Sequence, residues 1–182
     1  MFQWFRRAPS VRETGLAMVD PRAGDHLLVI GAADPRLAAS CAAATGLNGR
    51  AVVVGRGDDQ RRQIEQAAAS AGALIEFIDA PLTMLPFDDA AFGLVVVPKL
   101  RDDQGEPASA KIGEAVRVLK PAGRLVAVAG QKRAGIFGAL QTAEPRLAVD
   151  DVLTYLKAAG AVAARRLAEV EGVAYYEARK PR

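Results

Sequence analysis

The side chains that could bind a ligand follow directly after short apolar runs of the sequence. Five such runs lead into loops that begin at Gly31, Gly55, Asp79, Pro98 and Gly130. These loops combine small residues, which let a ligand approach the backbone closely, with carboxylates that accept its hydrogen bonds. The pattern indicates binding of a small molecule, and it assigns no residue to catalysis.

The composition argues against chemistry that depends on histidine or cysteine. The chain has one histidine, His26, and one cysteine, Cys41. These two residues cannot form a zinc site of the usual four-ligand type, and a His-dependent catalytic triad is not expected either. A single cysteine also forms no internal disulfide, so the sequence predicts a reducing, cytoplasmic location and no bound metal.

The loops are positioned by apolar runs that alternate with helical runs. Continuously apolar strands separated by helices are typical of a parallel sheet that helices cover on both faces. The last two strands are joined by Glu171-Gly172, which predicts an antiparallel C-terminal hairpin. In an open parallel sheet, ligands bind at the carboxyl ends of the strands, where the five loops lie. The predicted strands are 26–30, 50–54, 74–78, 92–97, 124–129, 161–167 and 173–178, and the predicted helices are 37–45, 59–70, 109–119 and 149–159.

Length and composition predict one domain over residues 1–182. With 51% hydrophobic and 25% charged residues, the chain has enough apolar side chains for a sizeable core. The net charge of +3 gives no strong case for nucleic-acid binding, and no apolar run reaches the ~18 residues of a membrane span. Residues 1–23 are expected to form an N-terminal helical segment. Its aromatic residues Phe2, Trp4 and Phe5 either form a lid over the site or pack on the sheet edge or on a partner.

One segment, Glu114–Val126, predicts a helix end, a turn and a strand, in that order. It reads E-A-V-R-V-L-K-P-A-G-R-L-V. Pro121 stops the helix, and Gly123 is expected to take the positive φ of the turn. The segment closely resembles the run R-V-L-K-P-G-G-R-L that precedes the fifth strand of class I S-adenosylmethionine-dependent methyltransferases. Only Ala122 departs from that run, where it replaces the first glycine.

The resemblance extends over about residues 24–180. Residues 78–92 read I-D-A-P-L-T-M-L-P-F-D-D-A-A-F and are similar to the family's G-D-A-x-x-L-P-F-x-D-x-x-F. It implies a Rossmann-like α/β methyltransferase fold with a seven-stranded, mostly parallel sheet and a C-terminal antiparallel hairpin. It also implies S-adenosylmethionine as cofactor and a small-molecule acceptor. In this comparison Asp79 matches the residue that contacts the adenine amino group, and the N–H of Ala80 faces the ring.

Three cofactor positions depart from the family pattern. The first loop keeps Gly31 of G-x-G-x-G but has Ala33 and Pro35 at the other two glycines. Gly55 stands where the family has an acidic residue that binds both ribose hydroxyls, and Gly93 replaces an aspartate. Weak cofactor binding is therefore expected. The resemblance implies these cofactor-binding residues: Gly31, Ala32, Ala33, Asp34, Gly55, Arg56, Asp79, Ala80 and Pro98.

The carboxylates after Gly55 and the basic residues of two later loops each have two interpretations. Asp58 and Asp59 either cap the following helix or reach the ribose from a longer loop. The basic side chains either meet an acidic acceptor or are solvated loop charges. They are Lys99, Arg101, Lys132 and Arg133.

Three functions are compatible with these residues. The first is a methyltransferase for an unidentified small molecule. The second is a methyltransferase-fold protein without activity that serves as a binding or assembly module, which the altered loops favour. The third is an NADP-binding Rossmann protein, because V52-V-V-G-R resembles the strand and arginine that hold a 2′-phosphate in some short-chain reductases. Tyr176 and Lys180 match the Y-x-x-x-K of those reductases, but they fall in the last predicted strand rather than on a helix.

Overall fold

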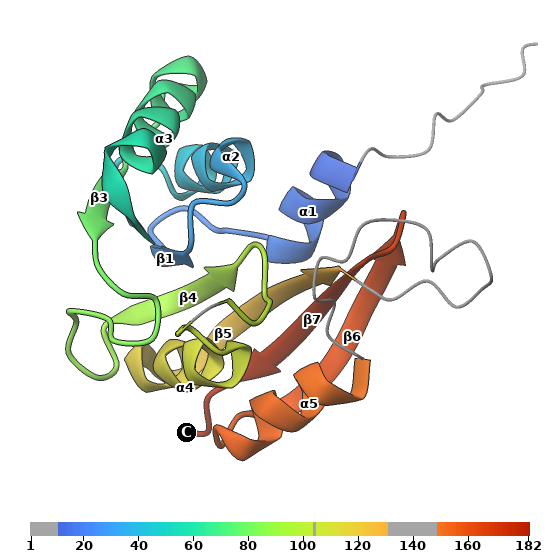
Figure 1. Ribbon diagram of the computed structural model, residues 1–182. Coiled ribbons are helices and arrows are strands. Elements are labelled where there is room, and N and C mark those ends of the chain that lie inside the picture. The colour runs from blue at the N-terminus through green and yellow to red at the C-terminus, as the bar shows by residue number, and fades with distance from the viewer. Residues whose placement is uncertain (1–10, 104, 131–148) are drawn as a thin grey trace, which may run out of the picture.

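The computed structural model describes residues 11–103, 105–130 and 149–182 (Figure 1). These residues form seven strands and five helices. In chain order they are α1 (Val11–Val19), β1 (His26–Ile30), α2 (Pro35–Thr45), β2 (Arg50–Gly55), α3 (Gly57–Ala71), β3 (Glu76–Asp79), β4 (Phe92–Val97), α4 (Ala108–Val118), β5 (Leu119–Gly130), α5 (Val149–Ala158), β6 (Val162–Val170) and β7 (Val173–Arg179). In two places, β3–β4 and β6–β7, the strands follow each other without a helix between them.

The strands form one sheet in the order β3-β2-β1-β4-β5-β7-β6. All neighbours among the first five strands pair in parallel, and β7 lies antiparallel to both β5 and β6. The predicted fold class is confirmed, including the C-terminal hairpin. The strand order reverses beside β1, so the carboxyl ends of β1 and β4 flank the switch point at which open α/β sheets bind ligands.

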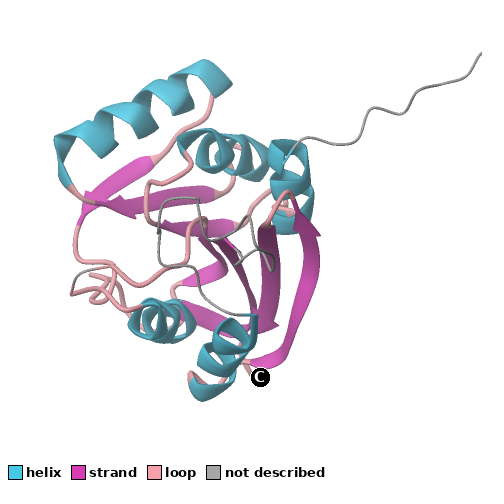
Figure 2. Cartoon of the chain, turned by 45° about the vertical axis from the view of Figure 1, so that its right-hand side comes forward, coloured by secondary structure: helices cyan, strands magenta, loops and turns pink. Residues whose placement is uncertain are grey.

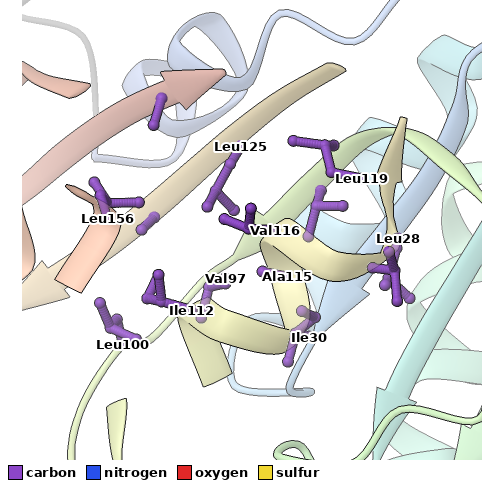
Figure 3. Packing of buried hydrophobic residues seen from close by; sticks show 14 of the residues in the cluster. Leu28, Ile30, Val97, Leu100, Ile112, Ala115, Val116, Leu119, Leu125 and Leu156 are labelled. Atoms are coloured by element: carbon purple, nitrogen blue, oxygen red, sulfur yellow. The ribbon is translucent and has the colours of Figure 1, made fainter. Parts of the chain in front are cut away.

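Helices cover both faces of the sheet, and each face has its own core. Helices α1, α2 and α3 lie on one side, and α4 and α5 on the other (Figures 1 and 2). Neighbouring residues of β1 face opposite cores: Leu27 packs toward α2 and α3, and Leu28 toward α4. Figure 3 shows Ile112 and Ala115 of α4 lying among the buried side chains of the second core. Burial on both faces explains why β1 is continuously apolar.

The buried face of α2 consists mainly of small side chains. Its buried residues include Leu37, Ala38 and the fully buried Cys41. Because the thiol is buried among apolar groups, with the negative charge of Asp34 adding to the effect, the pKa of Cys41 rises to about 12. Cys41 is therefore a packing residue in this structure and not a reactive thiol.

The start of β5 differs from the sequence prediction in which glycine the turn needs. Leu119 already pairs with Phe92, the next ladder pair joins Leu94 to Arg124, and the residues between loop out of the ladder. Ala122, not Gly123, takes the positive φ of +60°. The prediction for Gly123 was wrong, because this position requires a glycine for space: an added Cβ would lie 2.7 Å from the carbonyl oxygen of Lys120.

Candidate functional site

The first loop leaves β1 with a tight backbone turn. Gly31 has a φ of +96°, and its N–H donates to the carbonyl of Val54 at 2.8 Å. The Asp34 carboxylate accepts from the N–H of Leu37 at 2.9 Å and so caps α2, while Pro35 occupies the first turn. Ala32 is buried beneath the loop and Ala33 is exposed above it. The loop therefore presents Ala33 and Asp34 at the sheet edge.

The carboxyl end of β2 has no room for a side chain. A Cβ added to Gly55 would lie 2.7 Å from Oε1 of Gln60 and 2.9 Å from two ring carbons of Phe77. The same Gln60 oxygen accepts from the N–H of Arg56 at 3.0 Å, next to the start of α3. Phe77 is nine-tenths buried in the core beneath α3, and the Arg61 guanidinium lies 4.8 Å from the centre of its ring.

The end of β3 is tied to the end of β2 by two hydrogen bonds. The N–H of Gly57 donates to Oδ2 of Asp79 at 3.0 Å, and the N–H of Ala80 donates to the Gly55 carbonyl at 3.2 Å. Gly55 and Asp79 are also direct partners in the β2–β3 ladder. The structure thus brings Gly55, Asp79 and Ala80 together, and it uses the Ala80 N–H and one Asp79 oxygen within the protein.

Helix α4 holds the segment that follows β3. Glu114 accepts from the N–H of Leu85 at 2.7 Å, and Arg117 donates to the carbonyls of Leu85 and Phe87 at 3.0 and 2.8 Å. Hydrogen bonds from Arg117 hold the pKa of Glu114 below its usual value despite partial burial. The segment also reaches the first loop, because a side-chain carbon of Leu82 would lie 3.6 Å from a Cβ at Gly31.

A buried lysine anchors the loop between β4 and α4. Lys111 of α4 is 1% exposed and donates to a carboxylate oxygen of Asp103 at 2.6 Å and to the carbonyl of Arg101 at 3.1 Å. Burial opposes the charge of Asp103, but bonds from Lys111 and Arg101 outweigh it and lower the pKa of that carboxyl. Sequence reasoning missed Lys111. The available signal was its position in the apolar stripe that includes Ala108, Ile112 and Ala115, where a charged residue needs a partner.

A cavity of about 240 Å³ opens between the first loop, α1 and the ends of β4 and β7. It is lined by Gly15, Ala33, Asp34, Pro98, Lys99 and Tyr175 among others. Tyr175 is 2% exposed, and burial together with the charge of Asp34 raises the pKa of its phenol. The phenol is therefore protonated at neutral pH and is a hydrogen-bond donor.

The residues expected to bind the cofactor fall into two groups. Ala33, Asp34 and Pro98 line the cavity, while Gly55, Arg56, Asp79 and Ala80 lie at the ends of β2 and β3. Gly31 lies near the segment after β3, since a Cβ added to it would lie 3.6 Å from Leu82. Ala32 is buried beneath the first loop. Sequence reasoning gave no role to Gly15 of α1 or to Tyr175 of β7. Both are brought to the cavity by tertiary packing, for which no local motif exists.

Some expected contributors lie outside the described residues. They are Phe2, Trp4, Phe5, Lys132 and Arg133. Within the described part of the chain, no group of three His, Cys, Asp or Glu side chains could hold a metal ion. No helix in that part is long and apolar enough to cross a membrane.

The carboxylates and basic residues with two interpretations can also be placed. Asp58 and Asp59 are in the first turn of α3, where Asp59 forms an ion pair with Arg62. Arg101 pairs with Asp103 at 2.6 Å and so belongs to the β4–α4 loop rather than to the cavity, which Lys99 lines.

Comparisons with known proteins agree with this geometry. The family model of the methyltransferase domain matches residues 28–127. A solved S-adenosylmethionine-dependent methyltransferase from Aquifex aeolicus is 14% identical and covers 93% of this chain and 89% of its own, with a TM-score of 0.74. The YcgJ protein from Bacillus subtilis is 14% identical over 94% of this chain and 98% of its own, with a TM-score of 0.66.

The same fold also occurs in a protein that is described as a cyclase. SpnF is 16% identical over 98% of this chain and 85% of its own, with a TM-score of 0.69. At these sequence identities, the solved structures show only that this chain has the same fold. No curated protein sequence matches the chain.

Proposed function

Because the chain belongs to the class I S-adenosylmethionine-dependent methyltransferase family, we propose that it transfers a methyl group from S-adenosylmethionine to a small-molecule acceptor. The observation that carries the proposal is the cavity at the switch point of the sheet, which Ala33, Asp34 and Pro98 line. These three were expected at the cofactor from sequence alone. The proposal includes the other expected cofactor residues and a single domain over residues 1–182, and S-adenosylmethionine would supply an already activated methyl group.

The chain's own part in such a reaction is binding and alignment. Methyl transfer requires the acceptor to approach in line with the bond that breaks. Holding the two reactants in this orientation supplies a large part of the rate acceleration. In this proposal the positive φ of Gly31 allows close backbone approach, and Tyr175 donates a hydrogen bond in the enclosed space. Asp34 keeps the first loop in place by capping α2.

The two halves of the cofactor edge fit S-adenosylmethionine unequally. The cavity is of a size for the methionine part, and it has polar groups from Asp34, Lys99 and Tyr175 around it. At the end of β2, the position that binds ribose hydroxyls in nucleotide sites has no side chain and no space for one. Each charge-assisted hydrogen bond that is missing there costs roughly 1.5–3 kcal/mol of binding free energy. The affinity for S-adenosylmethionine is therefore expected to be weak.

Isothermal titration calorimetry of the full chain tests the proposal. We expect saturable binding of S-adenosylmethionine and of its product S-adenosylhomocysteine. Ala33→Phe, which places a ring at the cavity wall, is expected to abolish it. The matched control is Ala43→Phe, because Ala43 is also exposed but lies on α2, away from the cavity lining. Binding of NADPH alone would instead favour a nicotinamide cofactor.

The geometry of Gly55 favours a second candidate function. A methyltransferase-fold protein without methyl transfer, serving as a binding or assembly module, has no need of a ribose-binding side chain. A well-folded protein that binds none of these three compounds would support this candidate and contradict methyl transfer.

A further inference from the structure

We infer that Phe77 and Gln60 close the position from which a carboxylate would bind the ribose hydroxyls, so that this chain binds the nucleoside without recognising its 2′-hydroxyl. The inference rests on the proposed function for its ligand. In nucleotide-binding α/β proteins, an acidic residue at the end of the second strand takes the ribose hydroxyl. Here that position is Gly55, and neighbouring side chains occupy the space beside it.

The ring of Phe77 is held in place from several sides. Phe77 is buried in the core beneath α3, between β2 and the helix. The Arg61 guanidinium stacks over it at 4.8 Å, which adds a cation–π attraction. Gln60 is also engaged, because its Oε1 accepts from the N–H of Arg56. The space at Gly55 is therefore filled by the packed ring of Phe77 and by the end of the partly exposed Gln60 side chain, which one hydrogen bond holds.

The backbone groups at this edge are paired within the protein. The N–H groups of Arg56, Gly57 and Ala80 donate to Gln60, Asp79 and the Gly55 carbonyl, at 3.0, 3.0 and 3.2 Å. A ribose hydroxyl could accept from one of these N–H groups only by displacing its present partner, and an exchange of equivalent hydrogen bonds gives little net affinity. The backbone does not replace the missing carboxylate.

The two carboxylates next along the chain have a structural role. Asp58 and Asp59 lie in the first turn of α3, where the helix dipole stabilises negative charge. Asp59 also forms an ion pair with Arg62. Asp58 is the remaining side chain of its turn that could accept from a hydroxyl, so the test includes Asp58→Asn.

The experiment compares S-adenosylhomocysteine with its 2′-deoxy analogue by calorimetry on the full-length protein. We expect the two dissociation constants to agree within about twofold. A carboxylate that accepted from the 2′-hydroxyl would make the deoxy analogue weaker by about tenfold or more. A tenfold preference for the parent compound in the wild-type protein would overturn the inference, and its loss in Asp58→Asn would assign the recognition to that carboxylate.

A designed variant tests the cause. The double variant Gly55→Asp, Phe77→Leu supplies a carboxylate and removes the two ring carbons that would contact it, while leucine keeps the site apolar. The Gln60 oxygen is the end of a flexible, partly exposed side chain and can rotate away from the new Cβ. We expect this variant to prefer S-adenosylhomocysteine over the deoxy analogue by about tenfold. Phe77→Leu alone is the matched control, since it opens the space without the carboxylate, and its preference should stay near one.

The outcomes separate this inference from the proposed function. If the wild-type protein binds neither compound, methyl transfer fails, and the double variant still decides the inference. New binding of S-adenosylhomocysteine by the double variant and not by Phe77→Leu upholds it. No binding by a double variant that is folded by circular dichroism overturns it. If the double variant does not fold, the wild-type preference between the two compounds decides.

Discussion

At the scale of single residues, Ala122 is under backbone strain that a glycine would relieve. Its φ of +60° lies in the left-handed region, which costs a residue with a Cβ about 1 kcal/mol. Its side chain is exposed, so nothing is lost by removing the methyl group. We expect Ala122→Gly to raise the free energy of unfolding by about 1 kcal/mol, measured by urea denaturation.

Two controls separate this effect from a general effect of glycine. Ala43→Gly in the exposed face of α2 should destabilise the protein by about 1 kcal/mol, because glycine is unfavourable within a helix. Gly123→Ala should be strongly destabilising, because the new Cβ would meet the Lys120 carbonyl. Unchanged or reduced stability in Ala122→Gly would contradict the backbone assignment at this turn.

The same turn shows what the sequence could predict at residue scale. The Pro-Ala-Gly run predicted a helix end, which lies at Val118, and a turn, which the structure forms as an irregularity within β5. It did not identify the residue with positive φ, because that depends on how β5 joins the ladder with β4. The absence of space at Gly55 was equally out of reach, since it follows from the β2–β3 register that brings Phe77 beside it.

At the scale of elements, the loop between β4 and α4 depends on one buried lysine. Lys111→Met removes bonds to the Asp103 carboxylate and the Arg101 carbonyl. Asp103 keeps its ion pair with Arg101 at 2.6 Å and is a third exposed, which limits the cost of its charge. We expect a loss of about 2 kcal/mol in the free energy of unfolding, measured by urea denaturation.

Lys120→Met is the matched control for this change. Lys120 is exposed at the start of β5, and a surface substitution of this kind typically changes stability by less than about 0.5 kcal/mol. Equal effects of the two substitutions would show that Lys111 contributes no more than an ordinary surface charge.

Element types were more predictable than the contacts between elements. β1 and β4 have the predicted bounds, because their apolar runs end at Gly31 and Pro98 and β1 follows the polar Asp25. β3 is shorter than predicted and begins at Glu76, since Leu74 is exposed and Ile75 packs outside the ladder. The bonds from α4 to the segment after β3 connect residues some thirty positions apart, and no local pattern indicates them.

At the scale of the whole molecule, Glu177 of β7 links the two strands on either side of it, β5 and β6. It is buried on β7 and pairs with Arg124 of β5 at 2.5 Å and Arg165 of β6 at 2.7 Å. Arg124 also donates to the carbonyls of Met18 and Val19, the last residues of α1. Burial alone would raise the pKa of Glu177, but bonds from Arg165 and Arg124 outweigh it, and the pKa lies below its ordinary value.

Acid stability should therefore depend on Glu177. A carboxyl whose pKa is lowered on folding stabilises the protein above its unfolded pKa, about 4.3, and this contribution is lost as the pH falls through the folded value. We expect Glu177→Gln to lower the free energy of unfolding by about 2–3 kcal/mol at pH 7. The difference from wild type should narrow below about pH 4 in urea denaturation series. A difference that is constant from pH 7 to pH 3 would contradict this.

The overall topology was predictable because it follows from the order of elements. Parallel strands alternating with helices allow few arrangements, and a resemblance in the segment before β5 selected one of them. The cofactor edge is less predictable, because the residues there differ from the family pattern and their consequences depend on neighbours from other elements.

The position of Cys41 gives the molecule a reporter that needs no knowledge of the acceptor. The thiol is the one cysteine of the chain, lies fully buried on α2 and has a pKa of about 12. Because burial keeps the thiol protonated in the closed state, alkylation proceeds through moments when α2 separates from the sheet. The rate of Cys41 alkylation thus reports how often α2, the helix that Asp34 caps, opens. Any compound that binds at the start of α2 would lower this alkylation rate.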